Sequence, residues 1–354
     1  MLQDELKKLE NKTIIIYSAG NYGKYIFNLL KKYNITVTAF IDQNADNIEN
    51  FLNLPVYHYS INDVCLDFLK EDAIVIVALV KPFLEREAVF KKLQDHGFKN
   101  IIDAQSLRCH IVYHDRPISF SENLNEYTEL FNDEDSKSIY TSFVRSHHLF
   151  DFSDCIESKD SIQYFPYDIH FNKGYSRFID CGGYTGDTVW ELMKNKSGID
   201  AIAIFEPEIK VFNQLQSNMD WFINIIPDIF LYPCAVSDKV EMMNMNFESG
   251  SSFLTDKPTE EQVLCVSIDS VLKNFAPTFI KMDIEGAEIK ALQGAQETIK
   301  QYKPDLAICV YHCINHIWDI PLMLKKWVPS YKFYLRAHNS YTMETVLYAT
   351  TEEK

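Results

Sequence analysis

The feature that most constrains the fold is a pattern that occurs twice in the 354-residue chain. In each copy, an apolar run rich in β-branched residues leads into a glycine-containing turn, and the turn opens a helix-like segment. The first copy is TIIIYSAG followed by NYGKYIFNLLKKY, at residues 13–33. The second is RFIDCGGYTGDTVWELM, at residues 177–193. Because strands that alternate with helices build parallel sheets, the sequence predicts two α/β domains.

The first domain is expected at residues 1–108, as a smaller Rossmann-like parallel sheet. After its opening copy of the pattern, helices are expected near residues 61–70 and over 83–96. Its five strands are expected at 13–20, 37–42, 55–59, 73–79 and 100–103. Residues 109–170 are acidic, aromatic and poor in glycine, with helical spacing, and we expect a helical linker or lid of two or three helices there.

The second domain is expected at residues 171–354 as a doubly wound, mostly parallel sheet with helices between its first five strands. The strands are expected to begin near 177 and to continue at 201–208, 229–238, 278–286, 306–312, 331–338 and 344–350. Only NSYTM separates the last two, so they predict a hairpin. That hairpin makes one strand near the end of the sheet antiparallel.

The composition argues against several classes of function. The chain has 34 Lys and Arg against 50 Asp and Glu, a formal net charge of -16, and no long basic stretch, so we expect no nucleic-acid partner. The first ten residues, MLQDELKKLE, lack the apolar core of a secretory signal, and no apolar run is long enough to span a membrane. We expect a cytoplasmic protein, and the sequence is compatible with an oligomer. Its eight scattered cysteines do not indicate a disulfide framework.

The glycine loop of the second domain predicts a cofactor site. It joins a strand to a helix, which is where doubly wound sheets bind ligands. Twenty positions after Gly186, the next strand ends in Glu206, whose carboxylate can accept hydrogen bonds from both hydroxyls of a ribose. The loop alone could be a packing solution, but the pairing with Glu206 indicates a nucleoside cofactor. A dinucleotide fingerprint would need glycine where Cys181 stands, whereas the DxGxxxG spacing suits S-adenosylmethionine, with Asp180 placed to orient its methionine portion.

A longer segment resembles a known family. The run FIKMDIEGAEIKALQGA, at residues 279–295, is similar to the signature of the FkbM-type methyltransferases. The motifs DCGGYTGDT, FEPE and AVSD precede it in the expected order, and VYH, WDIP and YLRAH follow it, so the resemblance covers roughly residues 160–350. It implies a class I methyltransferase fold, S-adenosylmethionine as donor, and hydroxyl groups of sugars or secondary metabolites as acceptors.

The resemblance also implies site residues, by position in these motifs. The implied cofactor-binding set is Asp180, Gly182, Gly183, Tyr184, Gly186, Glu206, Pro207, Ala235, Val236 and Asp283. Within that set, Pro207 would shape the adenosine side, and Ala235 and Val236 would face the adenine. Asp283 and Glu285 would lie beside the transferred methyl group. The chain departs from the family at Tyr184, and at 310–312, where it reads Val-Tyr-His in place of an acidic residue.

Methyl transfer to a hydroxyl also needs a proton acceptor. His312 is our first candidate for the general base, because an imidazole titrates near neutrality, and Asp283 is either the second candidate or the group that orients His312. The alternative for His312 is a structural hydrogen bond at the end of a strand. Glu285 is a further catalytic candidate, although acidic residues here, Glu288 above all, also suit the first turn of a helix expected over EIKALQGAQETI.

A metal site is also conceivable at Cys309, His312, Cys313 and His316, which would share a face if they lay on a helix. However, LAICV is typical of a buried strand, in which the side chain of Cys309 would lie in the core. We therefore expect no metal. In the middle segment, residues 164–167 (YFPY) could cover the acceptor crevice, or could simply pack in the core.

The first domain has its own candidate nucleotide site. Gly20, Asn21, Tyr22 and Gly23 open its first helix, and Asp42 ends the next strand at a distance suited to a ribose. Residues 12–104 also resemble, more loosely, the small domains at the start of sugar acetyltransferases and polysaccharide-biosynthesis enzymes, which implies a nucleotide-sugar ligand. The alternative is a domain that only packs or dimerises.

Three hypotheses of function follow. The leading one is an S-adenosylmethionine-dependent methyltransferase acting on oxygen, in glycan or polysaccharide biosynthesis, with a small-molecule or glycan acceptor. The second is an NAD-dependent sugar-modifying enzyme that uses the first domain. The presence of Ser18 in place of a glycine argues against this hypothesis. The third is a nucleotide-sugar-binding or scaffolding protein whose methyltransferase fold is catalytically silent.

Overall fold

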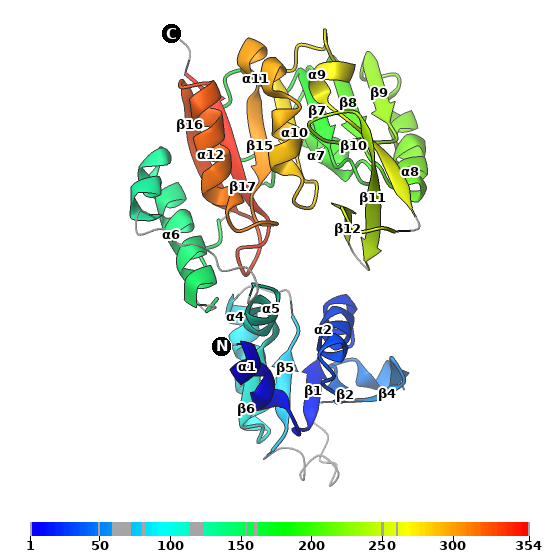
Figure 1. Cartoon of the computed structure of the whole chain (residues 1–354), viewed down its shortest axis with the longest axis vertical. Coiled ribbons are helices and arrows are strands. Elements are labelled where there is room, and N and C mark those ends of the chain that lie inside the picture. Colours follow the sequence, from blue (N-terminus) through cyan, green and yellow to red (C-terminus); the bar gives the residue numbers. More distant parts are fainter. Residues whose placement is uncertain are drawn as a thin grey trace. The chain divides into compact units, whose positions relative to one another are not determined.

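The computed structural model describes residues 2–48, 50–58, 72–79, 83–113, 124–149, 151–152, 154–158, 162–248, 251–259 and 261–352. The chain forms two compact units, one made of residues 1–120, 142–156 and 339–342 and the other of residues 121–141, 157–338 and 343–354. Each unit contains its own α/β sheet (Figure 1). Within the described residues, no helix is both long and apolar enough to cross a membrane.

The first unit is built on a six-stranded sheet with the order β3-β4-β2-β1-β5-β6. Five strands are parallel, as predicted: β1 (Ile14–Tyr17), β2 (Val37–Ile41), β4 (Leu54–Tyr57), β5 (Ile74–Val77) and β6 (Asn100–Asp103). A short β3 (Asn50–Phe51) pairs antiparallel with β4. The helices are α1 (Leu2–Leu9), α2 (Asn21–Lys32), a 3-10 turn η1 (Ala45–Asn47), α4 (Phe83–Asp95) and α5 (Ala104–Tyr113). The helix expected near 61–70 lies outside the described residues.

The second unit is built on a seven-stranded sheet with the order β16-β17-β15-β14-β7-β8-β9. Its strands are β7 (Arg177–Cys181), β8 (Ala201–Phe205), β9 (Asp228–Tyr232), β14 (Phe279–Met282), β15 (Asp305–Cys309), β16 (Tyr331–Ala337) and β17 (Thr345–Thr351). The predicted hairpin of the last two strands is confirmed, and β17 inserts between β15 and β16, antiparallel to both. The sheet is therefore mostly parallel with one antiparallel strand near its end.

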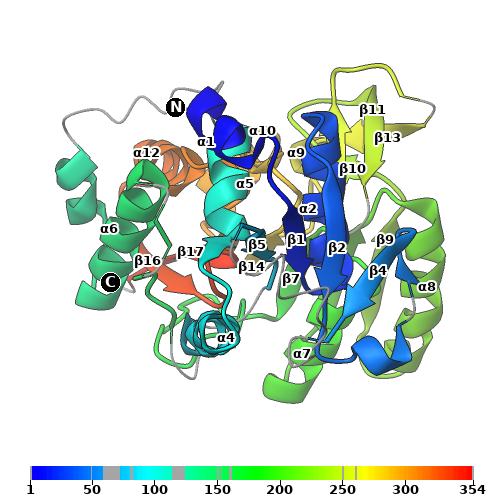
Figure 2. The same cartoon turned by 90° about the horizontal axis from the view of Figure 1, so that it is seen from below.

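Helices cover both faces of this sheet (Figure 2). Apolar side chains of α7 (Asp187–Asn195) and α8 (Ile209–Met219) pack with Phe178 of β7 and with Ile202 and Ile204 of β8 in one core cluster. On the other face lie α10 (Glu288–Gln293) and α12 (His316–Trp327), with α11 (Gln296–Tyr302) between them in the chain. The single helix expected over residues 288–299 is thus wrong, because it is two helices that meet at Gly294 and Ala295. The remaining helical segments are η2 (Leu124–Leu130), α6 (Glu134–Leu149), η3 (Asp220–Phe222) and α9 (Ile268–Val271).

A third sheet was not predicted. It has the order β10-β13-β11-β12, with β10 (Ala235–Val236), β11 (Glu241–Glu248), β12 (Ser251–Thr255) and β13 (Gln262–Val266). The strand expected at 229–238 is therefore wrong: it is β9 and β10, which belong to two sheets and are separated by a turn at Pro233, a residue with no N–H to donate. The helix expected between 238 and 278 is also wrong apart from the four-residue α9, because Met and Asn alternate in β11 with the period of a strand.

Candidate active site

A cavity of about 580 Å³ opens in the second unit at the carboxyl ends of β7, β8 and β14. This is the edge at which doubly wound sheets bind ligands. The predicted site residues that line it are Gly182, Tyr184, Glu206, Pro207, Ala235, Val236, Asp283 and Glu285. Four other predicted residues of this domain, namely Asp180, Gly183, Gly186 and His312, are not among the lining residues that the structure describes.

The glycine loop lies against the end of β14 without a side chain between them. Gly182 has a φ of 84°, and a Cβ there would overlap the carbonyl oxygen of Asp283. The backbone N–H groups of Gly182 and Gly183 both donate to the carbonyl oxygen of Phe205, at 3.0 Å. The loop is therefore held on both sides, and only glycine fits at position 182.

Asp180 lies behind this loop and is fully buried. Its Oδ1 is 2.9 Å from Nζ of Lys281, the neighbouring residue in the parallel β14, and the same ammonium donates to the carbonyl oxygen of Gly182 at 2.6 Å. Burial raises the pKa of Asp180 to about 6, against the opposing effect of Lys281. Both residues are ionised at neutral pH, and the ammonium of Lys281 holds the loop through the carbonyl oxygen of Gly182. Nothing in the sequence marked Lys281, because it stands inside an apolar strand.

Glu206 follows β8 and joins the loop to the next segment. Its Oε2 accepts the N–H of Tyr184 at 3.0 Å, and its Oε1 accepts the N–H of Glu208 at 2.8 Å. Burial raises the pKa of Glu206 to about 7. Each carboxylate oxygen has a second lone pair, so Glu206 can accept further hydrogen bonds from a ligand in the cavity.

The opposite wall of the cavity is apolar and comes partly from the unpredicted sheet. Ala235 and Val236 of β10 lie in this wall with Met245 of β11 and Leu254 of β12. The strand alternation in β11 was the only signal in the sequence that could have indicated Met245. A flat adenine ring is the kind of group that such a wall can cover.

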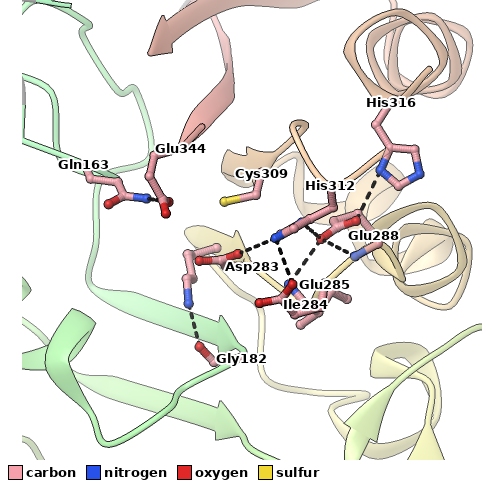
Figure 3. Close-up of polar contacts among 12 residues, drawn as sticks. Gln163, Gly182, Asp283, Ile284, Glu285, Glu288, Cys309, His312, His316 and Glu344 are labelled. Atoms are coloured by element: carbon pink, nitrogen blue, oxygen red, sulfur yellow. Dashed lines mark hydrogen bonds and ion pairs between the residues drawn. The ribbon is translucent and has the colours of Figure 1, made fainter. Parts of the chain in front are cut away.

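The far end of the cavity is acidic. Asp283 follows β14 directly, and its Oδ2 accepts the hydroxyl of Tyr164 at 2.7 Å. Glu344, from the β16–β17 hairpin, accepts a hydrogen bond from Nε2 of Gln163 at 2.6 Å (Figure 3). Sequence reasoning missed Gln163 and Glu344, which are 181 residues apart in the chain. Of the aromatic run at 164–167, Tyr164 lines this end.

His312 does not reach the cavity wall but lies immediately behind Asp283. Its Nε2 is 3.4 Å from Oδ1 of Asp283 and 3.5 Å from Oε2 of Glu285, and its Nδ1 is 2.8 Å from Oε1 of Glu288. Burial alone lowers the pKa of an imidazole, but the carboxylate of Glu288 and the two acidic neighbours raise the pKa of His312 to about 9. A pKa raised in this direction favours the protonated ring at neutral pH, which is unfavourable for the general base that the sequence led us to expect.

The four residues of the conceivable zinc site do not converge on one point. His312 and His316 both lie against Glu288, whereas Sγ of Cys309 is 3.8 Å from the hydroxyl of Tyr164. Among the described residues, the cluster with metal-ligand spacing is instead Asp283, Cys309 and Glu344. Burial raises the pKa of the Cys309 thiol well above its usual range, so it stays protonated and is a poor ligand.

In the first unit, the predicted nucleotide residues adopt a similar local arrangement. Oδ2 of Asp42 accepts the N–H of Ala19 at 2.8 Å, in the turn that precedes α2. Gly20 directly precedes that helix, Asn21 is its first residue, and a Cβ on Gly23 would overlap the carbonyl oxygen of Ser18. The hydroxyl of Tyr22 donates to Gln105. The loop is thus close to β1 and tied to Asp42.

The second unit has a seven-stranded sheet with one inserted antiparallel strand. Its cavity lies between the glycine loop after β7 and Asp283 at the end of the neighbouring β14. These features define the class I methyltransferase fold. Residues 180–333 match the Methyltransferase FkbM domain, so this segment of the chain is an FkbM methyltransferase domain.

A solved structure supports the fold. The crystal structure of a methyltransferase FkbM from Methylobacillus flagellatus KT matches with a TM-score of 0.78, over 98% of this chain and 93% of that chain. The two sequences are 20% identical, so the match carries the fold alone. Among curated proteins, none matches the sequence.

Proposed function

We propose that the protein transfers the methyl group of S-adenosylmethionine to a hydroxyl group of a sugar, a glycan or a small metabolite. The observation that carries the proposal is that Gly182, Glu206, Ala235 and Asp283 line one and the same cavity. Its volume of about 580 Å³ lies within the range of small-molecule sites. The FkbM domain over residues 180–333 supports the methyltransferase class.

The residues of the cavity suit this donor. Glu206 has lone pairs free for the ribose hydroxyls, and Ala235 and Val236 offer an apolar surface for the adenine. Gly182 lets the loop lie against the end of β14, where a Cβ would overlap the carbonyl oxygen of Asp283. When bound, S-adenosylmethionine supplies a methyl group that its sulfonium already activates. The chain then has to align the acceptor, exclude water and accept the proton of the hydroxyl.

Asp283 is our candidate for that proton acceptor. It lies at the end of β14 beside the glycine loop, and the hydrogen bond from Tyr164 fixes one of its oxygens. The acidic groups around His312 raise its pKa to about 9, so in this proposal the ring carries a positive charge and orients Asp283 instead of acting as the base. Glu285 is the next candidate, with a side chain 37% exposed.

The charge of the lining narrows the class of acceptor. Its acidic residues are Asp187, Glu206, Glu208, Asp283, Glu285 and Glu344. The basic residue among the described lining is Lys281, which is 2% exposed and paired with Asp180. A phosphate or carboxylate group of an acceptor would meet like charge in this cavity, so we favour a neutral polyol or an amine-bearing sugar.

Donor identity can be tested by calorimetry on the full chain. We expect binding of S-adenosylmethionine and S-adenosylhomocysteine, and none of NAD at the second unit. UDP-glucose tests the nucleotide-sugar ligand that we keep as a proposal for the first unit. Binding of NAD and of neither adenosyl compound would refute the proposal. Transfer of a labelled methyl group into an extract of the source cells, followed by identification of the product, tests the acceptor.

A further inference from the structure

Glu288 is the most enclosed acidic residue beside the cavity. It is the first residue of α10 and is 0% exposed. Its Oε1 accepts the backbone N–H groups of Ile284 at 3.2 Å and Gly286 at 3.3 Å, so it holds the turn that carries Asp283 and Glu285. A purely structural cap would need no more than these two bonds.

Two imidazoles also lie against this carboxylate (Figure 3). Nδ1 of His312 is 2.8 Å from Oε1, and Nδ1 of His316, from α12, is 3.2 Å from Oε2. The two histidines hold the pKa of Glu288 well below its usual range despite its burial. A buried carboxylate that stays ionised requires positive charge beside it, and these rings supply it.

The surroundings of the second ring nitrogen of His312, Nε2, determine the charge of the ring. Glu288 is ionised and only accepts hydrogen bonds, so Nδ1 of His312 must carry a proton. In a neutral ring, Nε2 would then present a lone pair towards Oδ1 of Asp283 and Oε2 of Glu285, at 3.4 and 3.5 Å. This lone pair would repel the two carboxylate oxygens. In an imidazolium, Nε2 carries a proton and attracts both oxygens. The side chain of His312 is 7% exposed, and Nε2 has no hydrogen-bond partner among the described residues.

The other groups around the ring do not change this conclusion. They come from β15 and the segment after it, from α12 and from the β16–β17 hairpin, and the titratable ones are Cys309, Tyr311, Cys313, His316 and Glu344. Burial raises the pKa values of Cys309 and Tyr311, so both are neutral. Glu344 adds a further acidic group and favours the cationic form.

We propose that Glu288, whose carboxylate also lies against the ring of His316, is a positioning residue that holds His312 as an imidazolium, and that this imidazolium orients Asp283 at the acceptor end of the cavity. His312 therefore does not act as the base, and the proton of the acceptor goes to Asp283. The catalytic meaning of the arrangement rests on the proposed function, whereas the charge of His312 does not.

The charge can be measured directly on the whole protein. The chain has ten histidines, and ¹⁵N-detected imidazole spectra of the wild type and His312→Gln assign the ring of His312. In the wild type we expect both nitrogens of His312 to be protonated at pH 7. In Glu288→Gln, which keeps an oxygen for the turn N–H groups but loses the charge, the titration midpoint should fall by about one pH unit or more. His316→Gln is the matched control, because it removes a neighbouring cation and should not lower the midpoint.

Methyl transfer gives the second measurement. With labelled donor and a cell extract as acceptor source, Glu288→Gln should lose rate at neutral pH while its dissociation constant for S-adenosylhomocysteine stays unchanged. A neutral His312 at pH 7 in the wild type would overturn the inference. So would an unchanged titration midpoint of His312 in Glu288→Gln. Absence of transfer or of donor binding in the wild type would instead count against the proposed function, and the wild-type spectrum remains decisive if the variant does not fold.

Discussion

Glu206 in the second unit and Asp42 in the first make the same pair of hydrogen bonds. Each carboxylate accepts an N–H from the loop after the first strand of its own sheet, Tyr184 at 3.0 Å and Ala19 at 2.8 Å respectively. Each also accepts the N–H two residues further along its own loop, at 2.8 Å in the second unit and 2.9 Å in the first. The acidic residue therefore stabilises the glycine loop in both units, whether or not a ribose is bound.

This equivalence provides a matched pair of variants. Glu206→Gln places an amide where two N–H groups need acceptors, and it weakens the hydrogen bonds available to a ribose. Because a hydrogen bond to a charged group contributes about 1.5–3 kcal/mol, affinity for S-adenosylhomocysteine should fall by about 10- to 100-fold in calorimetry. Asp42→Asn makes the same change in the first unit and should leave this affinity unchanged. Equal losses in both variants would contradict the assignment of the donor to the second unit.

Donor binding should also depend on pH through Glu206. Burial raises the pKa of this carboxyl to about 7, so it changes from neutral to ionised across the neutral range. The ionised form accepts stronger hydrogen bonds, and affinity for S-adenosylhomocysteine should rise between about pH 6 and pH 8. The increase should disappear in Glu206→Gln. An affinity that falls over this range in the wild type, or an unchanged increase in the variant, would show that another group controls binding.

A second matched pair tests the glycine loop. Gly182 and Gly198 both have positive φ, 84° and 74°, but a Cβ at 182 would overlap a carbonyl oxygen, whereas one at 198 would have nothing within 4 Å. Alanine should cost about 1–2 kcal/mol of backbone strain at either site. At 182 the overlap adds to this cost, so chemical denaturation should show a larger loss of stability and calorimetry a loss of donor binding. Similar losses in the two variants would mean that the loop does not approach β14 this closely.

The cluster around Glu288 predicts how stability varies with pH. His312 and His316 have pKa values raised from an ordinary 6.5 to about 9, so the stability they contribute is complete below pH 6.5 and is lost as pH rises through 9. Glu288 has a lowered pKa, so its contribution is complete above its ordinary value of 4.5 and is lost only in acid. Urea denaturation should therefore show the difference in unfolding free energy between wild type and Glu288→Gln shrinking from pH 6.5 to pH 10. A constant difference would mean that the two rings are not charged.

Much of the second unit could be predicted from local patterns. Each parallel strand is an apolar run between turn and helix signals, and the short NSYTM connection is too short for a parallel crossover, which identified the antiparallel β17. The sheet of β10 to β13 was missed because β10 has only two residues and the longest strand, β11, mixes polar and apolar side chains. In β11, Asn244 and Asn246 alternate with methionines, and no apolar run stands out from the surrounding loop.

The acceptor end could not be predicted, for a different physical reason. Its contacts depend on pairings between segments far apart in the chain, such as Gln163 with Glu344 and Tyr164 with Asp283. A sequence pattern shows which residues end a strand, but not which loops meet there. His312 was identified as a residue of interest, but its charge depends on Glu288, 24 residues away, and the expected role changes with that charge.

The buried pair of Asp180 and Lys281 tests whether Asp180 acts on the donor directly or through the loop. Asp180→Asn leaves the ammonium of Lys281 buried without its counter-ion, and removal of one partner from such a pair typically costs about 3–5 kcal/mol. The double variant Asp180→Leu with Lys281→Met removes both charges and should recover most of that stability in chemical denaturation. Because Lys281 also donates to the carbonyl oxygen of Gly182, the double variant should still bind S-adenosylhomocysteine more weakly than the wild type, as should Lys281→Met alone. If Lys281→Met instead keeps full affinity while a folded Asp180→Asn loses it, Asp180 contacts the donor itself, as its spacing in the sequence suggested.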